Sequence, residues 1–100
     1  MKRFKVLVLD EAENDFIKAI EYYKTINLTV AKKFYKATNT TLNDLKKNPF
    51  YQIRYDDFRM KMIKGFPYVL HFTVDEKLQT AFVYGIRNTY LNPDVSYIKK

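Results

Sequence analysis

The segment GFPYVLHFTVDE at residues 65–76 predicts one β-strand between two turns. Gly65 and Pro67 are typical of the turn before the strand, and Asp75 is typical of the turn after it. His71, the only histidine in the chain, lies inside this otherwise apolar strand. Because successive side chains of a strand point to opposite faces, the role of His71 depends on the face it occupies.

Similar strand patterns fill the C-terminal half of the chain. After Pro49 the apolar residues change from a helical period to a period of two. The strands predicted in this half span residues 50–55, 58–64, 68–74 and 78–87. One further β-rich run, residues 4–9, lies near the start of the chain. Short turn signals separate the last four strands, which favours antiparallel pairing.

Two amphipathic helices are predicted between the first strand and Pro49, because apolar side chains recur there every three or four residues. In the first helix, which starts at Asp10, the apolar stripe consists of Ala12, Phe16, Ile20 and Tyr23. In the second helix, the stripe consists of Val30, Phe34, Ala37, Thr41 and Leu45. Asp10 with Glu13 resembles a capping box, and Thr29 is the cap predicted for the second helix.

The order of the elements predicts an α+β fold. An N-terminal strand is followed by a helical hairpin and then by antiparallel strands, which form a twisted sheet with both helices on one face. The chain has 100 residues, and none of its segments resembles a linker or a low-complexity region. We therefore expect a single domain over residues 1–100.

The charge balance favours acidic partners. The 18 Lys and Arg residues against 11 Asp and Glu residues give a net charge of +7. Such an excess is typical of proteins that bind nucleic acid or an acidic protein segment. It also occurs on proteins whose surface charge only keeps them dispersed in solution.

The lack of cysteine excludes several kinds of site. The chain can form no disulfide, no thiolate zinc site and no cysteine nucleophile. With a single histidine as well, we expect no metal site and no cofactor. The first apolar run ends at Asp10, which is too short for a signal peptide or a membrane span. We therefore expect a cytoplasmic protein without membrane contact.

The alternation of side chains along the strands predicts which sheet face the helices cover. The bulky face consists of Phe58, Met60, Met62, Tyr68, Leu70, Phe72, Val74, Phe82, Tyr84 and Ile86. The other face carries four basic or titratable side chains, namely Arg59, Lys61, His71 and Arg87. Because two helices cover only one face, we expect this second face to be open and to contact phosphates or acidic groups.

The pairing register predicts how close these four side chains lie to one another. If Lys64 pairs with Tyr68 across the turn, Lys61 lies opposite His71. At the usual rise per strand residue, Arg87 then lies roughly 13–20 Å from His71 along the sheet. This separation favours a distributed anion-contacting surface over a tight catalytic pair.

Two interpretations of His71 stay open. It is either a half-exposed strand residue beside Lys61, whose charge lowers the proton affinity of the imidazole, or a base or base-stacking group on a nucleic-acid-binding face. Lys64 and Tyr90 are further candidates for contact with a target, and Tyr90 is able to stack on a base.

Three segments resemble the RelE/ParE superfamily of bacterial toxins: GFPYVLHFTVDE, RNTYLNP at residues 87–93 and VLVLDEAENDFIKAIEYY at residues 6–23. The resemblance covers nearly the whole chain. It implies the toxin half of a type II toxin–antitoxin module, which inhibits growth until a cognate antitoxin neutralises it. It also implies a hetero-oligomer, because the C-terminal segment of such an antitoxin wraps around the toxin.

The two branches of the superfamily imply different targets. RelE-like members cleave mRNA on the ribosome with basic and aromatic residues of the open sheet face, whereas ParE-like members poison DNA gyrase and are not enzymes. For an endoribonuclease, the catalytic candidates are Arg87, Lys61 and His71. The candidates for contact with nucleic acid or another target are Arg59, Lys64 and Tyr90. Arg87 matches an Arg that RelE-like nucleases place at the end of the last strand.

Three positions depart from the nuclease pattern. Val69, Asn88 and Leu91 stand where RelE-like and related members often carry Arg, His and Arg. The resemblance therefore favours ParE-like gyrase poisoning. The alternatives are a RelE-like ribosome-dependent mRNA endoribonuclease and a catalytically degenerate module that only binds its antitoxin. In each case we expect the antitoxin segment to be acidic and amphipathic.

Overall fold

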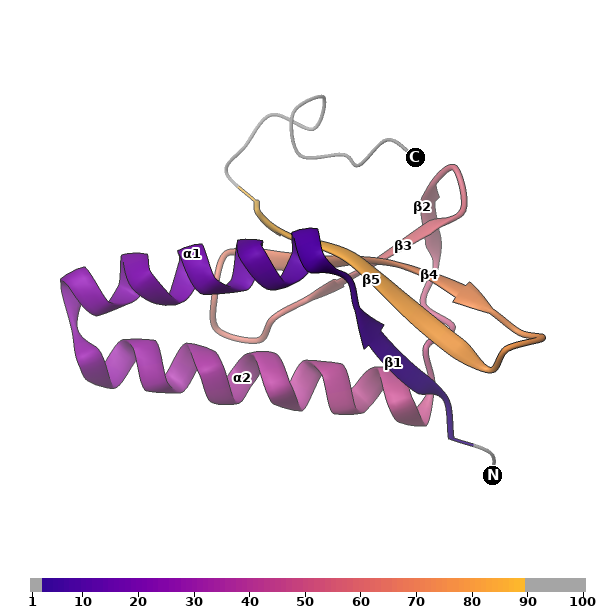
Figure 1. The fold of residues 1–100 in the computed structure, drawn as a ribbon, viewed down its shortest axis with the longest axis horizontal. Helices are drawn as coiled ribbons and strands as arrows, with labels where there is room; N and C mark the ends of the chain where they lie inside the picture. The colour runs from indigo at the N-terminus through magenta and orange to yellow at the C-terminus, as the bar shows by residue number, and fades with distance from the viewer. Residues whose placement is uncertain (1–2, 90–100) are drawn as a thin grey trace.

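Two helices and five strands make up residues 3–89, the part of the chain that the computed structural model describes (Figure 1). In chain order they are β1 (Lys5–Val8), α1 (Asp10–Ile26), α2 (Leu28–Lys47), β2 (Ile53–Tyr55), β3 (Phe58–Met62), β4 (Tyr68–Asp75) and β5 (Thr80–Asn88). The predicted order of elements is confirmed. The first strand after the helices is shorter than predicted, with three residues.

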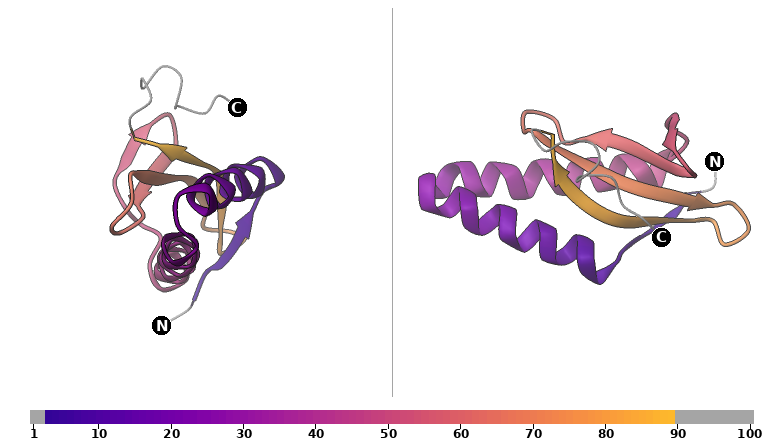
Figure 2. Two further views of the ribbon diagram at one scale, coloured as in Figure 1. Left: turned by 90° about the vertical axis from the view of Figure 1, so that its left-hand side faces the viewer. Right: turned by 90° about the horizontal axis from the view of Figure 1, so that it is seen from above.

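The strands form one mixed sheet in the order β1-β5-β4-β3-β2. Strands β2 to β5 pair antiparallel, as predicted, whereas β1 lies at the sheet edge and pairs parallel with β5. A parallel pair needs a long connection, and both helices and three strands lie between β1 and β5 in the chain. Both helices cover the same face of the sheet (Figure 1 and Figure 2), so the predicted α+β architecture is confirmed.

The main core lies between the helices and the sheet face that they cover, and Phe34 of α2 is at its centre. The Phe34 side chain is fully buried. Its ring centroid lies 5.1 Å from that of Tyr23, 5.0 Å from that of Phe66 and 5.2 Å from that of Tyr68. The sheet contributes Leu70, Phe72, Ala81, Val83 and Ile86 to this core, and Ile63 joins them from the residue directly after β3. Both predicted apolar stripes face it, which explains why the helical hairpin forms where the sequence predicts it.

The caps of the two helices differ from the predicted ones. Asp10 is the first residue of α1, and Leu9 before it makes no side-chain capping hydrogen bond. At α2 the cap is Asn27, whose side-chain oxygen accepts hydrogen bonds from the backbone N–H groups of Thr29 at 2.7 Å and Val30 at 3.4 Å. Both cap predictions are therefore wrong. The α2 helix begins one residue earlier than Thr29, so Asn27 occupies the position where a side chain reaches the free N–H groups.

Replacing Asn27 with alanine is expected to lower the free energy of unfolding by about 1 kcal/mol, because two N–H groups at the start of α2 lose their partner. Urea unfolding of the purified chain measures the change. Asn39→Ala, an exposed position within α2, serves as the control and should leave stability unchanged or slightly higher. Equal stabilities for the two variants would show that Asn27 does not cap the helix.

The β3–β4 hairpin differs from the predicted register by one residue. His71 pairs with Met60, whereas the sequence predicts Lys61 at this place. The backbone N–H of Ile63 donates to the carbonyl of Tyr68 at 2.9 Å, so residue 63 rather than residue 64 faces Tyr68, and the turn begins one residue earlier than predicted. The predicted register is therefore wrong.

This slip exchanges the two faces of β3, since a shift of one residue moves every side chain of a strand to the other side. Arg59 and Lys61 pair with Phe72 and Leu70, and both basic side chains lie on the side of the helices. The opposite side is called the far face here, and its side chains include Phe58, Met60, His71, Thr73 and Arg87. The prediction that Arg59 and Lys61 share a face with His71 is wrong.

A β-bulge also exchanges faces along β5. His71 pairs with Gly85 and Phe72 with Val83, which leaves Tyr84 as the additional residue on β5. Val83 is consequently buried in the main core, and Phe82 pairs with Thr73 of the far face. The predicted placement of Phe82 and Tyr84 beneath the helices is wrong, because strict alternation does not anticipate a bulge.

Candidate functional site

The far face carries a second, smaller apolar cluster around His71. The ring centroid of Phe58 lies 5.0 Å from that of Tyr55 and 5.1 Å from that of Tyr84. Phe58 is fully buried, and His71 is only 1% exposed. His71 is therefore neither half-exposed nor part of an open surface, because the register places Phe58 beside its strand and β2 brings Tyr55 against it.

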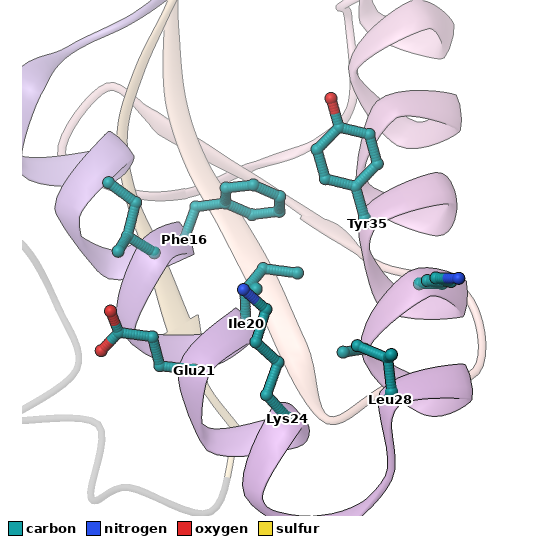
Figure 3. A pocket seen from close by; sticks show the side chains of 9 residues that line it. Phe16, Ile20, Glu21, Lys24, Leu28 and Tyr35 are labelled. Carbon is teal, nitrogen blue, oxygen red and sulfur yellow. The ribbon is translucent and has the colours of Figure 1, made fainter.

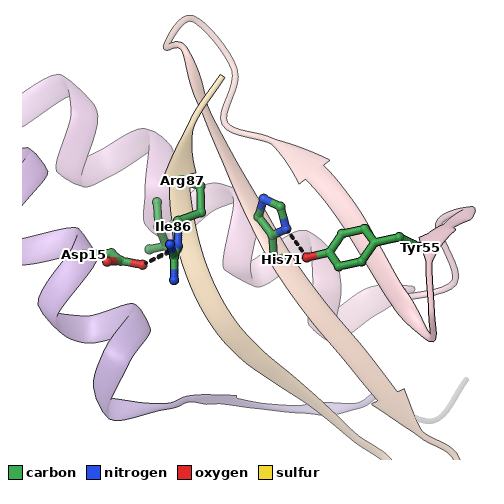
Figure 4. A network of polar contacts seen from close by, with 5 residues as sticks. All are labelled: Asp15, Tyr55, His71, Ile86 and Arg87. Atoms are coloured by element: carbon green, nitrogen blue, oxygen red, sulfur yellow. Dashed lines mark hydrogen bonds and ion pairs between the residues drawn. The ribbon is translucent and has the colours of Figure 1, made fainter. Parts of the chain in front are cut away.

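Tyr55 and His71 form a hydrogen bond across the strands (Figure 4). The Oη atom of Tyr55 lies 2.6 Å from Nδ1 of His71. Burial, and secondarily the charge of Arg87, lower the pKa of His71 from 6.5 to about 4. The imidazole is therefore neutral at pH 7. To use it as a base, a substrate would have to reach a side chain that the aromatic cluster almost completely covers.

Arg87 lies much closer to His71 than the sequence predicts. The β4–β5 register pairs Val69 with Arg87 and His71 with Gly85, so the two side chains are diagonal neighbours on one face. Diagonal neighbours of this kind are about 7–8 Å apart. The predicted separation is wrong, since the antiparallel register pairs Arg87 with Val69, only two residues before His71 on β4.

Asp15 of α1 holds the end of β5 (Figure 4). Its Oδ2 atom accepts a hydrogen bond of 3.0 Å from the Ile86 backbone N–H and lies 3.2 Å from Nε of Arg87. β1 pairs only with residues 80–83, so Asp15 supplies a partner to the β5 edge where β1 has ended. Burial raises the pKa of Asp15 above its usual value, while the Ile86 N–H and the charge of Arg87 act in the opposite direction.

The other predicted cations lie away from His71 and Arg87. Arg59 donates from Nη1 to the Tyr51 carbonyl at 2.6 Å. The ammonium of Lys61 lies 4.8 Å from the centroid of the Tyr51 ring, on the side of the helices. Lys64 is exposed in the turn between β3 and β4. The structure thus brings together two of the three catalytic candidates, His71 and Arg87, and separates them from Lys61.

Sequence patterns missed Tyr55 and Asp15, which contact His71 and Arg87. Neither contact leaves a local signal, because 16 residues separate Tyr55 from His71 and 71 residues separate Asp15 from its hydrogen-bond partner Ile86. Only the strand register and the placement of α1 reveal them. Tyr90, the remaining candidate for contact with a target, lies outside the described residues, as does Leu91.

An apolar groove of about 440 Å³ runs between α1 and α2 (Figure 3). Its lining includes Phe16 and Ile20 from α1 and Leu28 and Tyr35 from α2. Leu28 is 57% exposed and Tyr35 is 55% exposed, which is unusual for large apolar side chains that face the same groove. Charged side chains flank it, namely Glu21, Lys24 and Lys32.

Residues 3–89 contain no group of three His, Asp or Glu side chains placed to bind a metal ion. In the same range, neither helix combines the length and the apolar composition needed to cross a membrane.

No protein-family model and no curated protein sequence matches the chain. Among solved structures, the chain is similar to a chain described as the chromosomal ParDE TA (toxin–antitoxin) system from P. aeruginosa. The two share 13% sequence identity, the match covers 88% of this chain and 98% of the other, and the TM-score is 0.76. The protein therefore has the ParE-like α+β fold that the resemblance in its sequence predicts.

Proposed function

We propose that this protein is the toxin of a type II toxin–antitoxin module, and that it inhibits growth by poisoning DNA gyrase rather than by cleaving RNA. The fold shared with a ParDE chain over nearly the whole of that chain supports the first part of the proposal. The placement of Lys61 supports the second part, because this cation lies on the side of the helices while His71 and Arg87 lie on the far face. The proposed target also implies a location in the bacterial cytoplasm.

Cleavage of a phosphodiester needs a base and cations around one phosphate. Here the only histidine is 1% exposed, and an aspartate lies 3.2 Å from the guanidinium of Arg87. An inhibitor that acts by binding needs only a folded surface that fits its target. The geometry therefore favours binding over catalysis.

The groove between α1 and α2 suits the antitoxin that the proposal requires. Its apolar lining offers anchors for the apolar side of an amphipathic segment. Lys24 and Lys32 at its sides attract acidic side chains, although Glu21 reduces this effect. We propose that the acidic, amphipathic antitoxin segment docks here and that the pair forms a hetero-oligomer.

Induced expression of the chain in bacteria tests the proposal. Growth should stop when the chain is expressed alone and should resume when the neighbouring small open reading frame is expressed with it. The positions of mRNA 5′ ends should be the same with and without induction. Unchanged growth in the absence of any antitoxin would contradict the proposal and would favour a degenerate antitoxin-binding module.

The close approach of Arg87 to His71 favours a RelE-like nuclease as the second candidate. For this candidate, induction should create new mRNA 5′ ends that depend on translation. Arg87→Ala should then abolish them while the chain stays folded, because a cation near the reacting phosphate stabilises the charge of the transition state. New 5′ ends that persist in the Arg87→Ala variant would remove Arg87 from this mechanism.

A further inference from the structure

The two helices of the protein carry opposite charge. α1 contains five acidic residues, Asp10, Glu11, Glu13, Asp15 and Glu21, and only two lysines. α2 contains five lysines, Lys32, Lys33, Lys36, Lys46 and Lys47, and only one acidic residue. α2 is therefore net positive and α1 net negative, so the helical layer presents its positive charge on the α2 side.

Part of this charge lines a depression of about 370 Å³ between α2 and the end of β3. Lys33 and Lys36 lie three residues apart on α2, and Lys61 and Lys64 approach the depression from the β3–β4 hairpin. The register slip in β3 produces this arrangement, since it turns Lys61 toward the helices. The structure thus gathers two of the sequence-predicted cations with two lysines that the sequence did not single out.

Three of these four ammonium groups are on exposed side chains, whereas the ammonium of Lys61 lies 4.8 Å from the centroid of the Tyr51 ring. Lys33, Lys36 and Lys64 are exposed, and Lys61 is partly exposed. The ion pair recorded within residues 3–89 joins Arg87 and Asp15, and it involves none of the four lysines. Asp44, a carboxylate in the lining, forms no ion pair with them in that range.

We propose that this depression, defined by Lys33, Lys36, Lys61 and Lys64, binds the phosphate backbone of double-stranded DNA. Lysine ammonium groups contact phosphates as point charges, without reading the base sequence. Proteins that grip single strands add aromatic rings on which bases stack. The lining of this depression, all within the described residues, contains no aromatic side chain, which favours the outside of a duplex.

The choice of DNA over RNA rests on the proposed function, because the proposed target enzyme acts on duplex DNA. The toxin would then contact the DNA as well as the enzyme. Binding is measured without gyrase or antitoxin, so a failure of this inference leaves the proposed function untouched. Conversely, DNA binding by a chain that does not stop growth would refute only the proposed function.

Fluorescence anisotropy with a labelled duplex of about 20 base pairs tests the inference at several salt concentrations, using the full chain. If four phosphates are neutralised, the logarithm of the binding constant should fall against the logarithm of salt concentration with a slope of about −3.6. The Lys33→Gln, Lys36→Gln double variant should reduce the magnitude of this slope by about 1.8. The Lys18→Gln, Lys24→Gln double variant on α1 removes the same charge elsewhere and should leave the slope unchanged.

Three results would overturn the inference. If both double variants reduced the magnitude of the salt slope equally, DNA binding would depend only on the net charge of the protein and not on this depression. If a duplex RNA of the same sequence bound more tightly than the duplex DNA, the depression would be an RNA-binding site instead. Competition by polyglutamate, together with a wild-type DNA slope near zero, would assign the depression to an acidic protein segment. Circular dichroism checks that both variants stay folded, which exposed lysines on helices should allow.

Discussion

Replacing Phe34 with alanine is expected to lower the free energy of unfolding by about 4 kcal/mol, the largest loss we expect from a single substitution. Phe34 is fully buried among four aromatic rings, those of Phe16, Tyr23, Phe66 and Tyr68. Alanine removes the burial of a whole ring and leaves a cavity that these large neighbours cannot fill without moving. Because a domain of this size is stable by only about 5–15 kcal/mol, the variant should be partly unfolded at moderate urea concentrations.

Tyr35→Ala is the matched control for Phe34→Ala. It removes an aromatic ring from the next position of the same helix, but Tyr35 is 55% exposed. We expect a loss of about 1 kcal/mol or less, since an exposed side chain contributes little burial. Urea unfolding followed by circular dichroism measures both variants. Comparable losses would contradict the assignment of Phe34 to the centre of the core.

Acidification from pH 7 to pH 5 is expected to destabilise the wild-type chain by about 2 kcal/mol more than a His71→Gln variant. The pKa of His71 is about 4 in the folded chain, below its ordinary value of 6.5 in the unfolded chain. Between these values the unfolded chain binds a proton that the folded chain excludes. The free energy of unfolding therefore does not depend on the protonation of His71 well above pH 6.5, and it falls as the pH decreases toward 4.

The His71→Gln variant isolates this effect because glutamine does not titrate and is able to hydrogen-bond the Tyr55 hydroxyl. Asp15, whose pKa is raised by burial, titrates in both proteins and cancels in the comparison. Urea unfolding at several pH values between 7 and 5 gives the difference. Parallel pH dependence of the wild type and the variant would show that His71 takes up its proton in the folded chain as readily as in the unfolded one.

The sequence predicts the helices well because their signal is local. An apolar stripe with helical spacing identifies Phe16, Ile20, Tyr23 and Phe34 as residues that face the core, and all four do so. The helix caps are a weaker signal, since several residue types near Leu28 are able to cap. Asn27 and Thr29 stand two positions apart, and only the position of the first helical turn decides between them.

The faces of the sheet are predicted less well, because they depend on single-residue details of turns and bulges. The turn after Ile63 shifts β3 by one residue and moves Lys61 to the side of the helices. The bulge at Tyr84 has the same effect on part of β5. The shift of β3 removes Lys61 from the predicted site, and the bulge in β5 places Arg87 opposite Val69 on the face that carries His71. The shift of β3 also creates the lysine-lined depression beside α2, which no sequence pattern indicates.

The most direct test of the proposed function is a DNA cleavage assay with purified gyrase, supercoiled plasmid and increasing amounts of this protein. The proposal predicts that protein-linked double-strand breaks increase with the amount of the chain and disappear when the antitoxin is added. Intact plasmid at all concentrations, together with cleavage of mRNA on purified ribosomes, would contradict the proposal and identify the chain as a ribosome-dependent endoribonuclease.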